Sequence, residues 1–136
     1  THSNFKIKKI NSIKSITIDS LLSPDNFHDF KTIIKLDIEG NEMSAIQGGL
    51  KFIEKTSPII IIEFSQYIFN EKSKVEYLKN FLLNYDYSIY SVNKKKMSLD
   101  EIIIKLSQLT KRHKTIGNYY LIKNYSSNLN IFLSNE

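Results

Sequence analysis

Carboxylate side chains stand where two apolar segments of the chain end. Asp37 lies near the end of Thr32–Ile38 and Glu39 follows it, while Glu63 lies near the end of Ile59–Phe64. If these segments form neighbouring parallel strands, their carboxyl ends meet at one sheet edge, where open α/β sheets bind ligands. Three carboxylates gathered there could orient a substrate hydroxyl, act as a general base, or hold a hard cation such as Mg²⁺ or Ca²⁺.

The same carboxylates have a structural alternative. Acidic residues often follow strands because they cap the next helix and favour its positively polarised N-terminus. The residue types alone leave Asp37 evenly balanced between the two roles, and they favour the structural role slightly for Glu63.

Other residue types offer less chemistry. The three histidines, His2, His28 and His113, are too far apart in the sequence to show metal-ligand spacing. The chain has no cysteine, so it can form neither a disulfide nor a cysteine-ligated metal centre. It also lacks a Gly-x-Ser-x-Gly nucleophile motif, and its four glycines form no phosphate-binding loop.

The elements that must position the carboxylates follow from the spacing of apolar residues. Thr32–Ile38 predicts a strand. A helix is predicted after it, because apolar residues recur three or four positions apart at Met43, Ile46, Leu50 and Ile53. Asn41 can cap this helix. Gly48 and Gly49 lie inside it at a cost of about 1 kcal/mol each, which close approach of the helix to the sheet would explain.

The rest of the chain continues the alternation of strands and helices. Ile59–Phe64 is apolar on both faces, as in a strand of a parallel sheet that is covered on both sides. The sequence then predicts a second helix, a strand over Tyr87–Val92 and a solvated turn over Lys94–Lys96. After the turn it predicts a helix opened by the capping box at Ser98–Glu101 and a last strand over Tyr119–Ile122.

The two ends of the chain are predicted to differ from this core. Short half-exposed strands are expected within Phe5–Ile18, followed by a capped turn at Asp19–Leu22. The tail from Ser126 is rich in Ser and Asn, and much of it is expected to be poorly ordered. The sequence therefore predicts one α/β unit over residues 1–125 and a polar tail over residues 126–136.

Composition excludes several classes of function. The net charge is +5, but eighteen of the nineteen basic residues are Lys, so solvated lysines are favoured over a nucleic-acid-binding face. The longest apolar run, Ile59–Ile62, is far shorter than the roughly 20 residues that span a bilayer. Thr1–Lys9 does not resemble a signal peptide. A soluble, cytoplasmic protein without a nucleic-acid or membrane partner is expected.

Four sequence blocks together resemble the FkbM methyltransferase family. Ile34–Glu42 (IKLDIEGNE) is similar to the family's Lys-[Leu/Ile]-Asp-[Val/Ile]-Glu-Gly-x-Glu pattern, and Ala45–Leu50 (AIQGGL) to its following Leu-x-Gly-[Ala/Gly]. Thr17–Leu22 (TIDSLL) is similar to the upstream Thr-Leu-Asp-[Ser/Asp]-Leu-Leu, and Pro58–Glu63 (PIIIIE) to the downstream Pro-x-[Ile/Leu]-[Ile/Leu]-x-Glu. Beyond Glu63 only the general layout of helices and strands is similar.

The resemblance implies a Rossmann-like class I methyltransferase fold, with strand order 3-2-1-4-5-7-6 and strand 7 antiparallel. It also implies S-adenosylmethionine as methyl donor and a hydroxyl of a sugar or other small molecule as acceptor. Strands 4, 5, 6 and 7 would be Ile33–Ile38, Ile59–Phe64, Tyr87–Val92 and Tyr119–Ile122, giving the partial order 4-5-7-6.

The resemblance also assigns roles to individual residues. The loop after strand 4 lies beside the transferred methyl group in this fold, which implies catalytic roles for Asp37 and Glu39. Asp37 and Gly40 would contact the donor, and Glu42 and Glu63 would contact the acceptor. No metal ligand is implied, and a divalent cation is left open.

Strands 1 to 3, with the glycine-rich loop that holds the donor, would precede Thr1. We therefore expect the chain to be the C-terminal half of the domain, inactive alone and without measurable calorimetric binding of S-adenosylmethionine. The exposed edge of strand 4 would pair with a complementing N-terminal half or with a second copy, and light scattering would detect such a homodimer. The alternative is a non-catalytic half-domain that recruits a partner or a glycan.

Overall fold

A computed structural model of the chain describes residues 13–27, 30–110 and 114–134, and within them it shows a mixed five-stranded sheet. Its order is β1-β2-β5-β3-β4. The strands are β1 (Ile33–Leu36), β2 (Ile59–Ser65), β3 (Tyr87–Tyr90), β4 (Lys96–Met97) and β5 (Thr115–Lys123). β1 pairs with β2 in parallel, and β5 runs antiparallel to its neighbours β2 and β3. The predicted α/β class is confirmed, although the short strand β4 was not predicted and includes part of the expected lysine turn.

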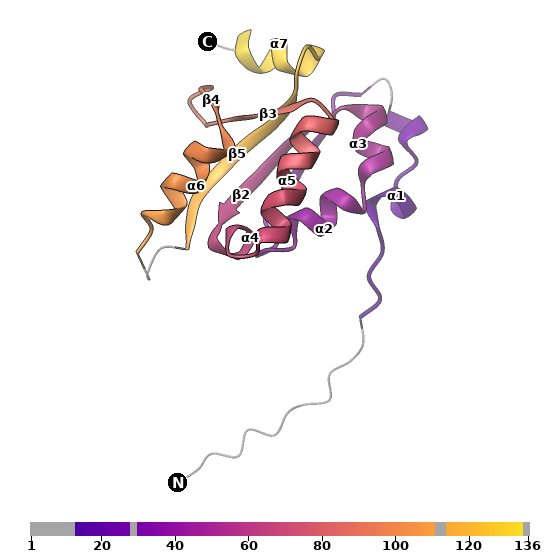
Figure 1. Ribbon diagram of the computed structural model, residues 1–136. Helices are drawn as coiled ribbons and strands as arrows, with labels where there is room; N and C mark the ends of the chain where they lie inside the picture. Colours follow the sequence, from indigo (N-terminus) through magenta and orange to yellow (C-terminus); the bar gives the residue numbers. More distant parts are fainter. Residues whose placement is uncertain (1–12, 28–29, 111–113, 135–136) are drawn as a thin grey trace.

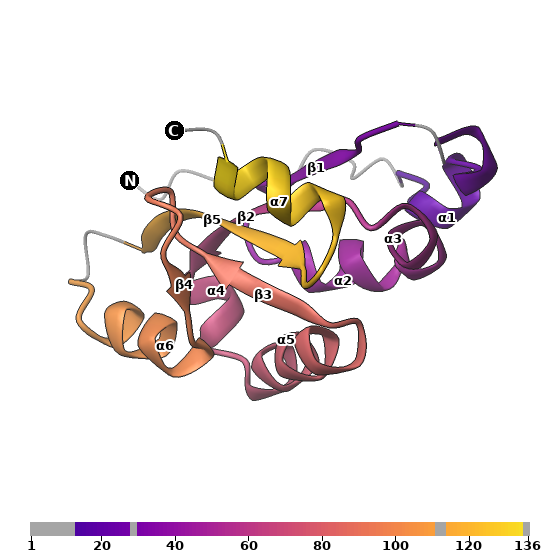
Figure 2. The same ribbon diagram turned by 90° about the horizontal axis from the view of Figure 1, so that it is seen from above.

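Helices cover the two faces of this sheet unequally. Helices α4 (Gln66–Phe69), α5 (Lys72–Asn84) and α6 (Leu99–Ser107) lie on one face, and α7 (Ser127–Ser134) lies on the other (Figure 2). The remaining helices are α1 (Ile18–Leu21), the 3-10 helix η1 (Pro24–Phe27), α2 (Glu42–Gln47) and α3 (Leu50–Thr56). Helices α1, α2 and α3 lie toward the β1 side of the sheet (Figures 1 and 2). No helix among the described residues is long and apolar enough to cross a membrane.

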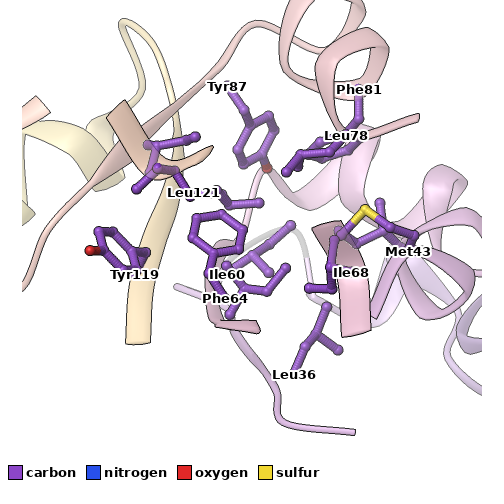
Figure 3. Packing of buried hydrophobic residues seen from close by; sticks show 14 of the residues in the cluster. Leu36, Met43, Ile60, Phe64, Ile68, Leu78, Phe81, Tyr87, Tyr119 and Leu121 are labelled. Atoms are coloured by element: carbon purple, nitrogen blue, oxygen red, sulfur yellow. The ribbon is translucent and has the colours of Figure 1, made fainter. Parts of the chain in front are cut away.

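The core lies between the sheet and the larger helical layer. Side chains alternate along a strand, and in β2 the alternate residues Ile60, Ile62 and Phe64 are fully buried. Figure 3 shows Ile60 and Phe64 packed with residues of α2, α4 and α5, among them Met43, Ile68, Leu78 and Phe81. The other face of β2, at Ile59 and Ile61, is only half-buried, so the expected cover on both sides is incomplete.

The predicted single helix after β1 is in fact two helices that break at Gly48 and Gly49. A Cβ at Gly48 would lie 3.3 Å from Thr17, and one at Gly49 would lie 3.1 Å from Ile18. The glycines therefore allow close approach of the segment that forms α1. The expectation that they face the sheet is wrong.

Asp19 explains why the chain breaks there. Its carboxylate accepts hydrogen bonds from the backbone N–H groups of Lys51 (3.1 Å) and Phe52 (2.9 Å), and its own N–H donates to the Gly48 carbonyl (2.9 Å). The first N–H groups of a helix have no partner within the helix. Asp19 thus caps α3 from 32 residues away and anchors the segment before β1.

The segment before β1 also corrects two smaller expectations. The residues up to Ile18 form no strand in the described part, because α1 begins at Ile18 with Thr17 as its N-cap; Phe5 and Ile7 lie outside the described residues. Asn41 occupies the N-cap position of α2, but its side chain makes no capping hydrogen bond. Its amide instead donates to the Ile38 carbonyl at 3.3 Å.

The tail from Ser126 contains a packed helix rather than the poorly ordered segment expected. The Phe132 ring of α7 lies 5.7 Å from the Tyr90 ring and 5.0 Å from the Tyr120 ring, measured between centroids. The buried Asn128 amide donates to the Ser57 carbonyl at 2.7 Å. Aromatic burial on the second face of the sheet orders this helix, and the division between residues 125 and 126 remains a prediction.

Removing the Asp19 carboxylate tests this account of the fold. Asp19→Ala should lower the free energy of unfolding by about 1–2 kcal/mol, because two helix N–H groups lose their acceptor. The measurement is urea denaturation followed by circular dichroism. Glu54→Gln, an exposed change on α3 itself, should leave the midpoint unchanged. Equal midpoints for Asp19→Ala and the unsubstituted chain would contradict the capping role.

Candidate functional site

The carboxyl ends of β1 and β2 form one edge of the sheet, together with the start of β5. The parallel register pairs Leu36 with Ile62, so Asp37, which follows β1, lies beside Glu63, which is still within β2. β5 enters this edge antiparallel, with Asn118 opposite Glu63. The predicted gathering of acidic residues at one edge therefore matches the strand register.

Glu42 organises the loop that follows β1. Its Oε1 accepts hydrogen bonds from the backbone N–H groups of Ile38 (3.1 Å) and Gly40 (3.2 Å), and the residue is only 1% exposed. Its Oε2 is also buried, and it has no hydrogen-bond partner among the described residues. Burial removes Glu42 from direct contact with a substrate in solution, so the structure favours a positioning role over the predicted acceptor contact.

Gly40 is required by both backbone geometry and packing. Its φ is +99°, a conformation that side chains with a Cβ rarely adopt. A Cβ on Gly40 would lie 2.8 Å from the Cβ of Tyr67 in α4. The loop also bends at Glu39, whose φ is +50°. The chain therefore turns sharply after β1, and its backbone lies directly against the first helix after β2.

The Asp37 carboxylate is held by an ion pair but remains accessible. Lys35 and Asp37 are two positions apart at the end of a strand, which places them on one face. Their Nζ and Oδ2 atoms lie 2.7 Å apart, and both side chains are about half exposed, at 53% and 51%. Because such exposed pairs contribute little stability, the pair orients the carboxylate more than it stabilises the fold. Glu39 is exposed and Glu63 is half-buried.

Tyr67 and Lys114 belong to this edge and were not predicted from the sequence. The Lys114 ammonium donates to the Tyr67 hydroxyl at 3.1 Å and lies 5.3 Å from the centre of its ring. The hydrogen bond to Tyr67 raises the pKa of Lys114, and the negative charge of Glu39 adds to this shift. The edge therefore holds a stable cation near its carboxylates. The two residues lie 47 positions apart, so only the fold brings them together.

The described residues do not include a set of side chains that could ligate a metal ion. No three His, Asp or Glu side chains there are close enough to hold a metal ion. Asp37 is already paired with Lys35, and Glu42 is committed to the loop backbone. The arrangement instead suits the orientation of a hydroxyl group and acceptance of its proton.

The fold places the chain in the class of open α/β-sheet proteins, in which ligands commonly bind outside the carboxyl ends of the strands. Comparison with protein families makes the class specific: residues 1–89, more than half of the chain, match the Methyltransferase FkbM domain. The chain belongs to the FkbM methyltransferase family. Comparisons with curated proteins and with solved structures gave no match.

The loop geometry leads to a direct prediction for Glu42. Glu42→Ala should lower the free energy of unfolding by on the order of 2–3 kcal/mol, since two backbone N–H groups, one of them buried, lose their side-chain acceptor. It should also speed hydrogen exchange at the amides of Ile38 and Gly40, measured by NMR. Glu39→Ala, an exposed neighbour in the same loop, should leave both amides protected. Unchanged protection in Glu42→Ala would show that the loop is held by something else.

Proposed function

We propose that this chain contributes the acceptor side of an S-adenosylmethionine-dependent O-methyltransferase that acts on a hydroxyl of a sugar or other small molecule. The observation that carries the proposal is the position of Asp37, just after β1, beside Glu63 near the end of β2, in a member of a methyltransferase family. The order β1-β2-β5-β3, with β5 antiparallel, corresponds to strands 4-5-7-6 of the class I methyltransferase sheet and supports the same proposal.

The edge suits a positively charged methyl donor in part. The exposed carboxylates of Asp37 and Glu39 place negative charges at this edge, and Lys35 and Lys114 lie close enough to balance part of them. Gly40 is buried against Tyr67 of α4, so it shapes the loop and is not open to direct contact with a ligand. The family resemblance implies two further donor-binding features, a glycine-rich loop and an acidic residue that contacts the ribose. Neither is found among the described residues. S-adenosylmethionine would supply an already activated methyl group when bound.

The residues of the chain supply positioning and proton acceptance. Asp37, oriented by Lys35, accepts a hydrogen bond from the acceptor hydroxyl and takes its proton as the oxygen becomes nucleophilic. Glu42 holds the loop so that Asp37 stays at the edge. Glu39, near the Lys114 cation, sets the charge balance of the same surface. Most of the rate acceleration comes from holding the acceptor oxygen in line for transfer.

We propose that the isolated chain is not competent and acts with a partner that supplies strands 1 to 3. In the described part of the chain β1 pairs only with β2, and Ile33 at this outer strand is 62% exposed. An open strand edge is a template for pairing with another strand. A complementing N-terminal half would pair with the open side of β1, and a homodimer through the same strand is the alternative. A cytoplasmic location remains part of the proposal.

The role of Asp37 can be measured in a polypeptide that contains this chain together with strands 1 to 3. Asp37→Asn should lower the turnover number on the order of 100-fold, because the amide cannot accept the hydroxyl proton. Stability should change little, because the Lys35–Asp37 pair is exposed. Methyl transfer is followed by release of S-adenosylhomocysteine. Glu54→Gln is the matched control for lost charge and should keep full activity. Unchanged turnover in Asp37→Asn would remove this residue from the mechanism.

A further inference from the structure

A second feature of the same sheet edge is a pocket of about 640 Å³. It lies between the turn that joins β3 to β4, the start of β5, and α6, and its polar lining includes Asn93, Lys95, Glu101, Lys105 and Asn118. Its volume is within the range of small-molecule sites. Because Asn118 is paired with Glu63 across β2 and β5, the pocket continues the edge that carries the candidate site.

A β-bulge in β5 shapes the mouth of this pocket. Asn118 pairs with Glu63, but Thr115 rather than Ile116 pairs with Ser65, so β5 contains one extra residue. Gly117 lies in this bulge with φ +89°, and a Cβ there would meet nothing within 4 Å. Bulges bend a strand and re-aim its side chains, and they are common beside active sites. Here the bulge opens space next to α6.

The charges that line the pocket are unequally compensated. Glu101 accepts the Ser98 backbone N–H through Oε2 at 2.7 Å, and its Oε1 lies 3.4 Å from the Lys95 ammonium. The hydrogen bond from the Ser98 backbone lowers the pKa of Glu101, so this carboxylate stays ionised and balances Lys95.

The charge of Lys105, unlike that of Lys95, is not balanced by a nearby carboxylate among the described residues. Its ammonium lies 3.4 Å from the Tyr119 hydroxyl and 5.8 Å from the centre of the Tyr119 ring. In the part of the chain that the structure describes, no carboxylate lies within ion-pair distance of Lys105. The pocket therefore presents one cation without a counter-charge, beside an aromatic wall and two amide side chains.

We infer that this pocket binds the acceptor of the proposed methyl transfer, and that this acceptor carries an anionic group, a carboxylate or a phosphate, on a polyhydroxylated body. Lys105 would pair with the anion, and the Asn93 and Asn118 amides would bind hydroxyl groups. The inference depends on the proposed function only for the identification of the ligand as an acceptor. Two strand spacings, roughly 10 Å, separate β5 from β1. The acceptor must therefore extend along the edge to reach Asp37.

The test is direct binding, without methyl transfer. The full chain is titrated with D-glucuronate, D-glucose 6-phosphate and neutral D-glucose at low ionic strength, and binding is followed by NMR shifts of the Lys105, Gly117 and Asn118 amides. Lys105→Gln is compared with Lys51→Gln, which removes the same charge from the exposed surface of α3.

At least one of the two anions should bind saturably, about tenfold more tightly than glucose, and Lys105→Gln should remove that preference. Saturable binding of D-glucuronate would identify the anionic group as a carboxylate, and saturable binding of D-glucose 6-phosphate would identify it as a phosphate. Lys51→Gln should bind as the unsubstituted chain does. The inference would be overturned if glucose and both anions bind equally, or if neither anion binds saturably. It would also be overturned if Lys105→Gln keeps the preference of the unsubstituted chain for the anion. None of these results bears on Asp37, because activity and the donor are absent from the measurement.

Discussion

The parallel pairing of β1 with β2 is the interaction on which the site depends. Four residue pairs, from Ile33 with Ile59 to Leu36 with Ile62, fix the register. A one-residue shift would turn every side chain of β1 to the other face and would exchange the buried Leu36 for the charged Lys35. The apolar core on one face therefore holds Asp37 beside Glu63 at the edge. Burial of Ile60, Ile62 and Phe64 supplies the energy that maintains this arrangement.

Two carboxylates accept hydrogen bonds from backbone N–H groups and so hold the backbone in place. Asp19 caps α3, and Glu42 binds the N–H groups of the loop after β1. Both lie in the blocks that resemble the family pattern, so part of that pattern encodes the shape of the site. At this edge the side chains of Asp37 and Glu39 are exposed, and Glu63 is half-buried. The separation of these roles follows from burial, because a buried carboxylate must be satisfied by nearby donors.

Local sequence patterns predicted the positions of β1, β2, β3 and β5. β-branched runs identify β1 and β2, and the capping box of α6 forms as expected between Ser98 and Glu101. The features missed depend on distant contacts. The start of α3 is capped by Asp19, which lies about 30 residues upstream, and the Tyr67–Lys114 pair joins α4 to the residue before β5. The helix α7 was obscured by its Ser- and Asn-rich composition, although Leu129 and Phe132 are spaced three positions apart, as on one helical face.

The register of β1 against β2 can be measured directly by nuclear Overhauser contacts between backbone protons in the isotopically labelled chain. The account predicts cross-strand contacts that place Leu36 opposite Ile62 and Ile33 opposite Ile59. These contacts would fix Asp37 and Glu63 at the same edge. Contacts that place Leu36 opposite Ile61 or Glu63, or the absence of contacts between the two strands, would contradict the site described above.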